Sequence, residues 1–270
     1  MVLAALFCIQ CTRSEATKTN SVVAVADGQT VGHVSAQRMA EIERLAAKDH
    51  ILLLRQCLEN YDAKYQDYTC TFCKTERING QLRPEQQIDV KFRDTPFSVA
   101  MHWLTNSPKA DRILFVQGQN NDKMLAQPKG MLALLTNGAV TRDPCGKDVM
   151  ADTLRPVTLF GFKNMMTSLL DIYQQAHDNG ESVDSFNGYA VIGGKKVLAC
   201  QRVLPYRKGY PAKTTTWYID PEWMVPLGME AYDWNDQLIC RYLYTDVKFN
   251  VGMTEKDFTP AINCIDVKEK

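Results

Sequence analysis

The chain has 270 residues, of which 45% are hydrophobic, 9% aromatic and 23% charged, a composition typical of one or two globular domains and not of a disordered protein. Its 31 Lys and Arg residues balance its 31 Asp and Glu residues, which disfavours a dedicated nucleic-acid-binding protein because no overall positive field attracts phosphate backbones. No apolar run reaches the roughly 20 residues that a membrane-spanning helix needs.

The first 26 residues are similar to an export signal. An apolar stretch, residues 1–11, has the length of a secretory h-region, and a polar segment and the small residues Ala24-Val25-Ala26 follow it. We therefore predict an exported protein of the periplasm or cell envelope. Cys8 or Cys11 could carry a lipid anchor after cleavage. A truncated start and an ordinary cytosolic N-terminus remain open.

Residues 27–62 are predicted to hold a connection and an N-terminal helix. The apolar residues of 35–61 recur at spacings of mostly three, four and seven, which is typical of an amphipathic helix, here with a break near Asp49. From residue 65 the apolar period becomes two. A strand is expected up to Ile78, and Asn79-Gly80 predicts a hairpin turn.

The rest of the chain is predicted to be mostly strands with one helical insert. Residues 137–152 are interpreted as a loop, and Thr158 as the cap of a helix that runs to about His177 inside an insert over residues 153–178. The further strands are 87–93, 97–103, 113–117, 123–126, 189–192, 196–204, 214–220, 225–234 and 238–249. The prediction is one α+β domain, residues 63–260, that forms a curved, unclosed antiparallel barrel of about nine or ten strands, with residues 261–270 as a tail.

The apolar faces of these strands must be covered, and the insert helix could cover them as a lid. The helix is rich in flexible apolar side chains: Met165, Met166, Leu169 and Leu170. The strands supply large side chains that could line a hydrophobic cavity beneath it: Phe97, Met101, Trp103, Phe115 and Trp217. The alternative is a fully filled core.

Catalytic and metal-binding signatures are weak. Cys70 and Cys73 form a CxxC, but they lie three apart on a predicted strand and so point to opposite faces; core or disulfide cysteines are expected, with no metal and no cofactor. An enzyme that uses Cys70 with His102 is a third hypothesis. Residues 195–213 carry six basic residues and no acidic one, which suits an anionic lipid surface or, alternatively, a solvated edge strand.

Several segments carry a resemblance to a known family. They are DYTCTFCKTERINGQL, VKFRDTPFSVAMHWL, LRPVTLFGFKNMMTSLL, YIDPEWMVPLGMEAYDWNDQ and YLYTDVKFNVGMTEKDF. Over about residues 61–258 the chain resembles a bacterial exported family known only as domain of unknown function 1571. More distantly it is similar to the periplasmic lipoprotein carriers LolA and LolB, in which a helical lid closes an acyl-binding cavity inside an unclosed barrel.

The resemblance to the carriers implies a non-catalytic protein that binds an acyl chain or another hydrophobic ligand. Two carrier patterns are matched: the first by Arg93, Pro96, Phe97 and Trp103, and the second by Asp220, Val225 and Pro226. Arg93 would then latch the lid or anchor a polar group. A lipoprotein or an envelope protein is a further candidate partner. The alternative function is a filled structural or interaction module of the cell envelope that binds proteins through an exposed strand edge.

Overall fold

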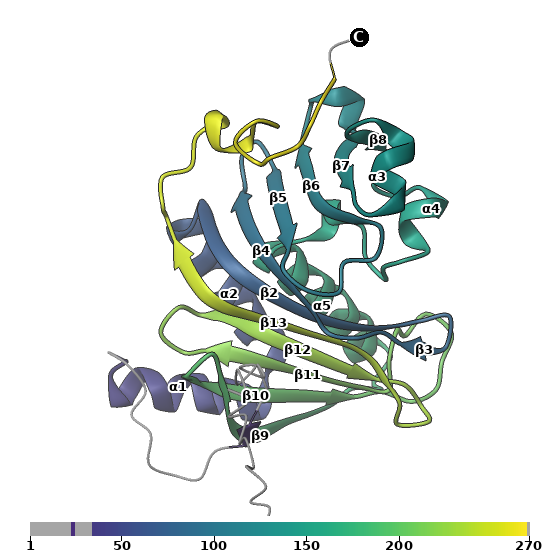
Figure 1. Cartoon of the computed structure of the whole chain (residues 1–270). Helices are drawn as coiled ribbons and strands as arrows, with labels where there is room; N and C mark the ends of the chain where they lie inside the picture. The colour runs from purple at the N-terminus through teal and green to yellow at the C-terminus, as the bar shows by residue number, and fades with distance from the viewer. Residues whose placement is uncertain (1–22, 25–33, 269–270) are drawn as a thin grey trace, which may run out of the picture.

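The computed structural model describes residues 23–24 and 34–268 of the chain (Figure 1). Cys8, Cys11 and nearly all of the predicted export signal lie outside the described residues. Within the described part of the chain, no helix has the length and apolar character needed to cross a membrane.

The first two helices meet at Asp49. The Ser35 side chain caps α1 (Ala36–Lys48) by accepting a hydrogen bond from the Arg38 N–H at 3.2 Å. Asp49 ends α1, and its carboxylate accepts the Leu52 N–H at 2.8 Å to begin α2 (His50–Lys64). The first N–H groups of a helix have no partner within the helix, and the Asp49 carboxylate accepts one of them. A second helix can therefore begin here in a new direction.

The strands form one antiparallel sheet of 13 strands among the described residues, and its path runs β1-β9-β10-β11-β12-β13-β2-β4-β5-β6-β7-β8, with β3 paired to β2. The strands are β1 (Val23–Ala24), β2 (Asp67–Ile78), β3 (Gln81–Leu82), β4 (Gln86–Arg93), β5 (Ser98–Trp103), β6 (Ala110–Val116), β7 (Met124–Pro128), β8 (Val140–Arg142), β9 (Val183–Ile192), β10 (Lys195–Val203), β11 (Thr214–Asp220), β12 (Val225–Tyr232) and β13 (Leu238–Phe249).

The predicted curved, unclosed antiparallel sheet with helices is confirmed, and so is the hairpin at Asn79-Gly80, where both residues have positive φ. The predicted number of strands was too low. The missing strands include β1, β3 and β8, which have only two or three residues. Such short segments are too short to display a period of two in the sequence.

The middle of the chain is more structured than predicted. Residues 129–152 contain the short helices α3 (Met131–Thr136) and α4 (Lys147–Met150) on either side of β8. The insert helix α5 (Phe162–Asp178) begins after Gly161, and Thr158 lies in a separate 3-10 turn (Val157–Leu159) instead of capping the helix. Further 3-10 turns span Asn120–Asp122 and Glu255–Phe258.

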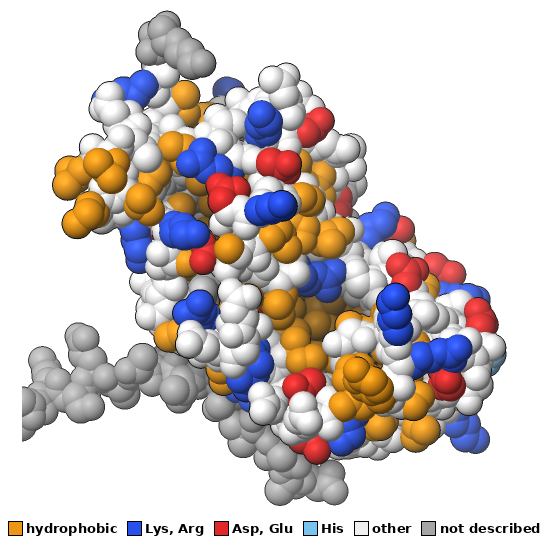
Figure 2. All heavy atoms as spheres, turned by 90° about the vertical axis from the view of Figure 1, so that its right-hand side faces the viewer, with side chains coloured by type: hydrophobic (Ala, Val, Ile, Leu, Met, Phe, Trp, Pro, Cys, Tyr) orange, Lys and Arg blue, Asp and Glu red, His pale blue; other side chains and the backbone are white. Residues whose placement is uncertain are grey.

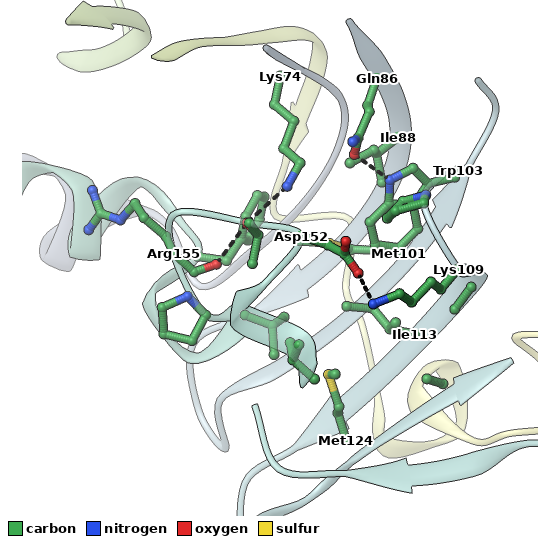
Figure 3. Close-up of a pocket in the computed structure, with 18 of the residues that line it drawn as sticks. Lys74, Gln86, Ile88, Met101, Trp103, Lys109, Ile113, Met124, Asp152 and Arg155 are labelled. Atoms are coloured by element: carbon green, nitrogen blue, oxygen red, sulfur yellow. Dashed lines mark hydrogen bonds and ion pairs between the residues drawn. The ribbon is translucent and has the colours of Figure 1, made fainter. Parts of the chain in front are cut away.

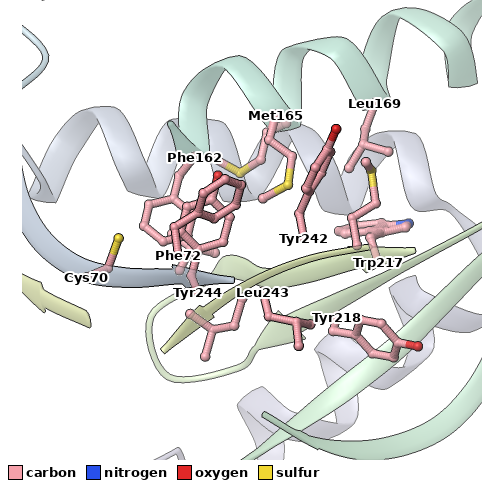
Figure 4. Packing of buried hydrophobic residues seen from close by; sticks show 14 of the residues in the cluster. Cys70, Phe72, Phe162, Met165, Leu169, Trp217, Tyr218, Tyr242, Leu243 and Tyr244 are labelled. Carbon is pink, nitrogen blue, oxygen red and sulfur yellow. The ribbon is translucent and has the colours of Figure 1, made fainter. Parts of the chain in front are cut away.

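The helices α2 and α5 pack against each other and cover the half of the sheet that contains β10 to β13 (Figure 1). Side chains from α5 and from the sheet interdigitate there, whereas Tyr218 and Leu243 point away from the helix (Figure 4). Phe162 lies 4.5 Å from Tyr244 between ring centroids, and Phe72 lies 4.9 Å from Tyr244. This half of the molecule is a filled core.

The other half of the sheet is covered on both faces. One face of β5, β6 and β7 packs against the C-terminal segment, where Phe258 and Ile265 are buried against Ala100, Leu114 and Leu125. Because side chains alternate along a strand, the opposite face carries the other set of apolar residues. That second face borders the pocket described below.

His50 is fully buried in the filled half, between the ring of Trp217 and the hydroxyl of Tyr173, to which its Nδ1 lies at 2.8 Å. Burial lowers the pKa of His50 below its ordinary 6.5, although Asp184 opposes this shift. The folded protein therefore binds fewer protons than the unfolded chain below that pH, and stability is lost as the pH falls through 6.5.

We expect the free energy of unfolding to decline between about pH 7.5 and 5.5, with a slope of up to about 1.4 kcal/mol per pH unit from this one group. Denaturant unfolding at several pH values measures this slope. His50→Gln should flatten the decline, because glutamine does not titrate. An equal slope in the variant would contradict the assignment to His50.

Candidate functional site

A pocket of about 380 Å³ lies between the second half of the sheet and the chain that follows β7. We call residues 129–161, which contain α3, β8 and α4, the cover segment. The pocket opens on the face that carries α3 and α4, where Figure 2 shows a hollow with hydrophobic side chains in its depth. Its volume is within the range of small-molecule binding sites, about 300–1,000 Å³.

The floor of the pocket comes from one face of β4 to β7. In the sheet register Met101 pairs with Val90 on one side and with Ile113 on the other, and Ile113 pairs with Ala126. Directly paired residues point to the same face, so an apolar row crosses four strands. Ile88, Trp103 and Met124 extend this floor (Figure 3).

The roof is made by the cover segment and by the start of α5. Its apolar side chains are Leu132, Val140, Val149, Val157, Leu159, Phe160 and Met165. Phe160 also contacts Phe72 of the sheet, with ring centroids 5.2 Å apart. The pocket thus ends where the cover segment joins the filled core.

One group of polar side chains in the pocket is paired by hydrogen bonds. Glu76 is only 4% exposed, and it accepts hydrogen bonds from the Tyr242 hydroxyl at 2.6 Å and the Lys74 ammonium at 3.2 Å. Lys74 also donates to the Thr153 hydroxyl of the cover segment at 3.0 Å. Burial, together with nearby Cys240 and Glu76, raises the pKa of Tyr242 well above its ordinary value, so its hydroxyl stays a donor.

A second polar contact lies beside the floor, where the Trp103 indole N–H donates to the Gln86 amide oxygen at 2.7 Å. Two ion pairs involve the rim: Lys109 with Asp152 at 2.7 Å, and Arg142 with Asp148 at 3.0 Å. Exposed pairs of this kind contribute about 0–1 kcal/mol each. They leave the cover segment only weakly held at its outer edge.

The structure brings some of the predicted site residues together and separates others. Met101 and Trp103 line the pocket, and so does Met165 of the predicted lid. Phe97 packs on both Phe92 and Phe115, and neither Phe97 nor Phe115 is part of the pocket lining. Of the other lid residues, Met166 and Leu169 are buried in the filled core and Leu170 packs against it.

Trp217 does not line the pocket. It is fully buried on β11, where its indole N–H donates to the Tyr173 hydroxyl of α5 at 2.9 Å. Five strands lie between β11 and β6 in the sheet: β12, β13, β2, β4 and β5. The predictions that Trp217 lines the cavity and that α5 as a whole is its lid are therefore corrected. Most of α5 packs on a filled core that contains Trp217, and the cover segment closes the pocket together with the start of α5.

Arg93 lies on the other face of the sheet from the predicted lid. On β4 it alternates with the pocket side, as Asp89 and Lys91 do. Its guanidinium lies 5.1 Å from the ring centroid of Phe258 in the C-terminal segment and donates to the Ser98 hydroxyl at 3.4 Å. The prediction that Arg93 latches the lid is therefore wrong: Arg93 contacts the C-terminal segment instead.

The sequence reasoning missed most of the roof and part of the floor. Ile113, Met124 and Ala126 lie on strands that the sequence did predict, and pairing those strands with the one that carries Met101 would have found them. The apolar run Met131-Leu132-Ala133-Leu134-Leu135 was a visible signal for α3. The pairing of β2 with β13 brings three further lining residues to the pocket, namely Phe72, Tyr242 and Tyr244. The sequence alone does not display this long-range pairing.

The structure gives the Cys70–His102 hypothesis little support. Burial is the main cause that raises the pKa of the Cys70 thiol well above its ordinary value, which disfavours the thiolate that a nucleophile needs. His102 instead has its Nε2 at 3.3 Å from the Arg112 guanidinium. Among the described residues, no group of three or more His, Cys, Asp and Glu side chains could hold a metal ion.

Gly161 joins the cover segment to α5 in a conformation that favours glycine, with φ of 107°. A Cβ atom there would lie 2.9 Å from Cζ and 3.0 Å from Cε2 of the Phe92 ring. We expect Gly161→Ala to lower the free energy of unfolding by about 1–3 kcal/mol more than Gly180→Ala, because overpacking is added to the backbone strain.

Gly180 is the matched control, since its φ is 66° and nothing lies within 4 Å of its Cβ position. Denaturant unfolding of both variants measures the difference. Equal losses of stability would contradict the close approach of Phe92.

No curated protein sequence matches the chain. Solved structures with a similar arrangement include the complex of MucA and MucB from Pseudomonas aeruginosa, with 13% identity, a TM-score of 0.47, and coverage of 82% of this chain and 64% of that one. The chain therefore spans less than two thirds of the length of the MucB chains that it matches. The lipoprotein LppX of Mycobacterium tuberculosis matches with 12% identity, a TM-score of 0.44, and coverage of 77% and 99%.

A LolA superfamily protein from Nitrosomonas europaea matches with 8% identity, a TM-score of 0.33, and coverage of 77% of this chain and 98% of that one. Likenesses of this size assign no ligand or partner to the chain. A family model, described as "Protein of unknown function (DUF1571)", matches residues 65–263.

Proposed function

The chain belongs to the family described as protein of unknown function DUF1571, and we propose, from its own pocket, that it is a non-catalytic binding protein for an acyl chain or a similar hydrophobic ligand. The observation that carries the proposal is the apolar space of about 380 Å³ between the sheet floor and the cover segment. The export predicted from the N-terminal sequence would place this binding in the cell envelope.

The chemistry of the lining supports an acyl ligand. Met101, Ile113, Met124 and Val149 offer flexible or aliphatic contacts along the length of the pocket. Burying about a dozen methylenes contributes on the order of 10 kcal/mol before the costs of binding. No ionic anchor is needed for that affinity.

The paired polar side chains inside the pocket restrict the ligand. Glu76 and Lys74 are paired with each other, and Tyr242 and Thr153 complete their hydrogen bonds. A strongly charged head group would have to break these bonds on entry, which leaves buried groups without partners. A ligand that directs its apolar chain inward and keeps its head group at the solvent-facing mouth avoids this cost.

Extraction of the purified protein with organic solvent, followed by mass analysis, and displacement of a fluorescent fatty acid test the proposal together. We expect a co-purified lipid, saturable binding of the fatty acid, or both. Neither lipid nor displacement would overturn the proposal and would favour an envelope interaction module instead.

A further inference from the structure

The short helix α3 exposes a group of large apolar side chains beside the pocket. Met131 is 79% exposed, Leu134 85% and Leu135 76%. These residues follow a spacing of i, i+3 and i+4, so they share the outer side of the helix. In Figure 2 hydrophobic side chains gather at the protruding upper left of the face that carries α3. Exposed groups of this kind mark contact sites with partners or membranes.

The same helix also belongs to the pocket. Leu132 and Thr136, four residues apart, line its roof. An apolar path therefore leads from the exposed side of α3 to the interior of the pocket within a single helix.

Basic side chains lie on both sides of α3. Residues 123–142 contain Lys123, Lys129 and Arg142 and no acidic residue, and of these Arg142 is paired with Asp148 at 3.0 Å. Lys129 lies directly before the helix and is exposed. Lys268 of the C-terminal segment is also exposed and lies beside Gly138, directly after the helix: its Cγ is 3.2 Å from the position of a Cβ on that glycine. The Asp266 carboxylate lies beside the same position, with Oδ2 at 3.5 Å, so Lys129 is the basic residue next to α3 that has no carboxylate beside it among the described residues.

We infer that α3 docks the protein on an anionic lipid bilayer, with Met131, Leu134 and Leu135 inserted among the head groups and the flanking lysines on the phosphates. Only the reason for docking rests on the proposed function. Docking would place the pocket mouth at the membrane, so that an acyl chain could enter the pocket without crossing water. The binding itself depends on α3 and the lysines alone.

A second copy of the chain fits this surface less well. Two such patches would bring the lysines of both copies together, and like charges repel. A helix of six residues also presents too little area for a stable interface, which buries about 1,200–2,000 Å². An anionic bilayer complements both the apolar side chains and the charge.

The test is co-sedimentation with vesicles of phosphatidylcholine that contain about one third phosphatidylglycerol, a fraction chosen to give a negative surface. We expect wild-type protein to bind, and the double variant Leu134→Gln/Leu135→Gln to bind at least about tenfold more weakly. Raising NaCl from about 0.05 M to about 0.5 M should weaken wild-type binding. Leu52→Gln, at a side chain that is 41% exposed on α2, is the control and should bind as wild type.

Equal binding by wild type and the double variant, or equal binding to pure phosphatidylcholine, would overturn the inference. A dimer in solution that the double variant abolishes, without vesicle binding by the wild type, would replace it with a self-association surface. Fatty-acid binding in solution separates the two proposals. Vesicle binding without fatty-acid binding would overturn only the ligand proposal, and the reverse result would overturn only the docking.

Discussion

Replacement of Ala126 by tryptophan is expected to weaken fatty-acid binding by at least about tenfold, because the indole would occupy space that the acyl chain needs. Ala126 lies on β7, at the end of the apolar row that crosses the floor; it is paired with Ile113 and is 6% exposed. The pocket of about 380 Å³ offers room for the added ring. Fluorescence titration with a fatty-acid probe measures the affinity.

Ala40→Trp is the matched control, since Ala40 is exposed on α1 and the same ring would enter solvent there. We expect the control to bind the probe as wild type does. The free energy of unfolding of Ala126→Trp should stay within about 1 kcal/mol of wild type, because the ring fills a hollow and displaces no packed side chain. Unchanged affinity in a folded Ala126→Trp protein would place the ligand elsewhere.

Replacement of Trp217 by alanine is expected to have the largest effect on stability, a loss of about 3–5 kcal/mol in the free energy of unfolding. Trp217 is fully buried against His50 and Tyr173. Its removal leaves a cavity and takes from the Tyr173 hydroxyl one of its two hydrogen-bond partners, the other being His50. The affinity of the folded variant for the fatty-acid probe should remain within about twofold of wild type, because β11 lies outside the pocket.

Met101→Ala provides the contrast, since Met101 lies on the pocket floor. It should weaken probe binding more than Trp217→Ala does. Denaturant unfolding and probe titration on both variants give the comparison. Loss of affinity without loss of stability in Trp217→Ala would restore Trp217 to the ligand site and contradict the filled core.

Local sequence patterns predicted the strands and helices well where they were long. The alternation of Ile88, Val90 and Phe92 determines which face of β4 is buried, because a strand buried on one face must alternate. The break at Asp49 was visible because a helix-capping residue interrupts the apolar pattern.

The location of the pocket could not be read from the same patterns. Trp217 and Trp103 are both large side chains on predicted strands. Only the order of the strands in the sheet places Trp217 in a filled core and Trp103 at the pocket. That order depends on long-range pairing, such as β2 with β13, which a single sequence does not display.

Arg93 shows a different limit. Its position after alternating residues already indicated the face opposite to Phe92, but the resemblance to the carriers suggested a contact with the lid. The C-terminal segment supplies the contact instead, through Phe258. A residue's side of a strand is a local property, whereas its partner is not.

Photo-crosslinking with a fatty acid that carries a diazirine near the end of its chain tests the central claim most directly. If the acyl chain lies between the floor and the cover segment, the crosslinks should fall on β5 to β7, at Met101, Ile113 or Met124, and on Phe160 or Met165 of the roof. Unlabelled fatty acid should compete for them. Crosslinks confined to the filled half around Trp217 or to the C-terminal segment, or no competed crosslink at all, would contradict the proposed pocket.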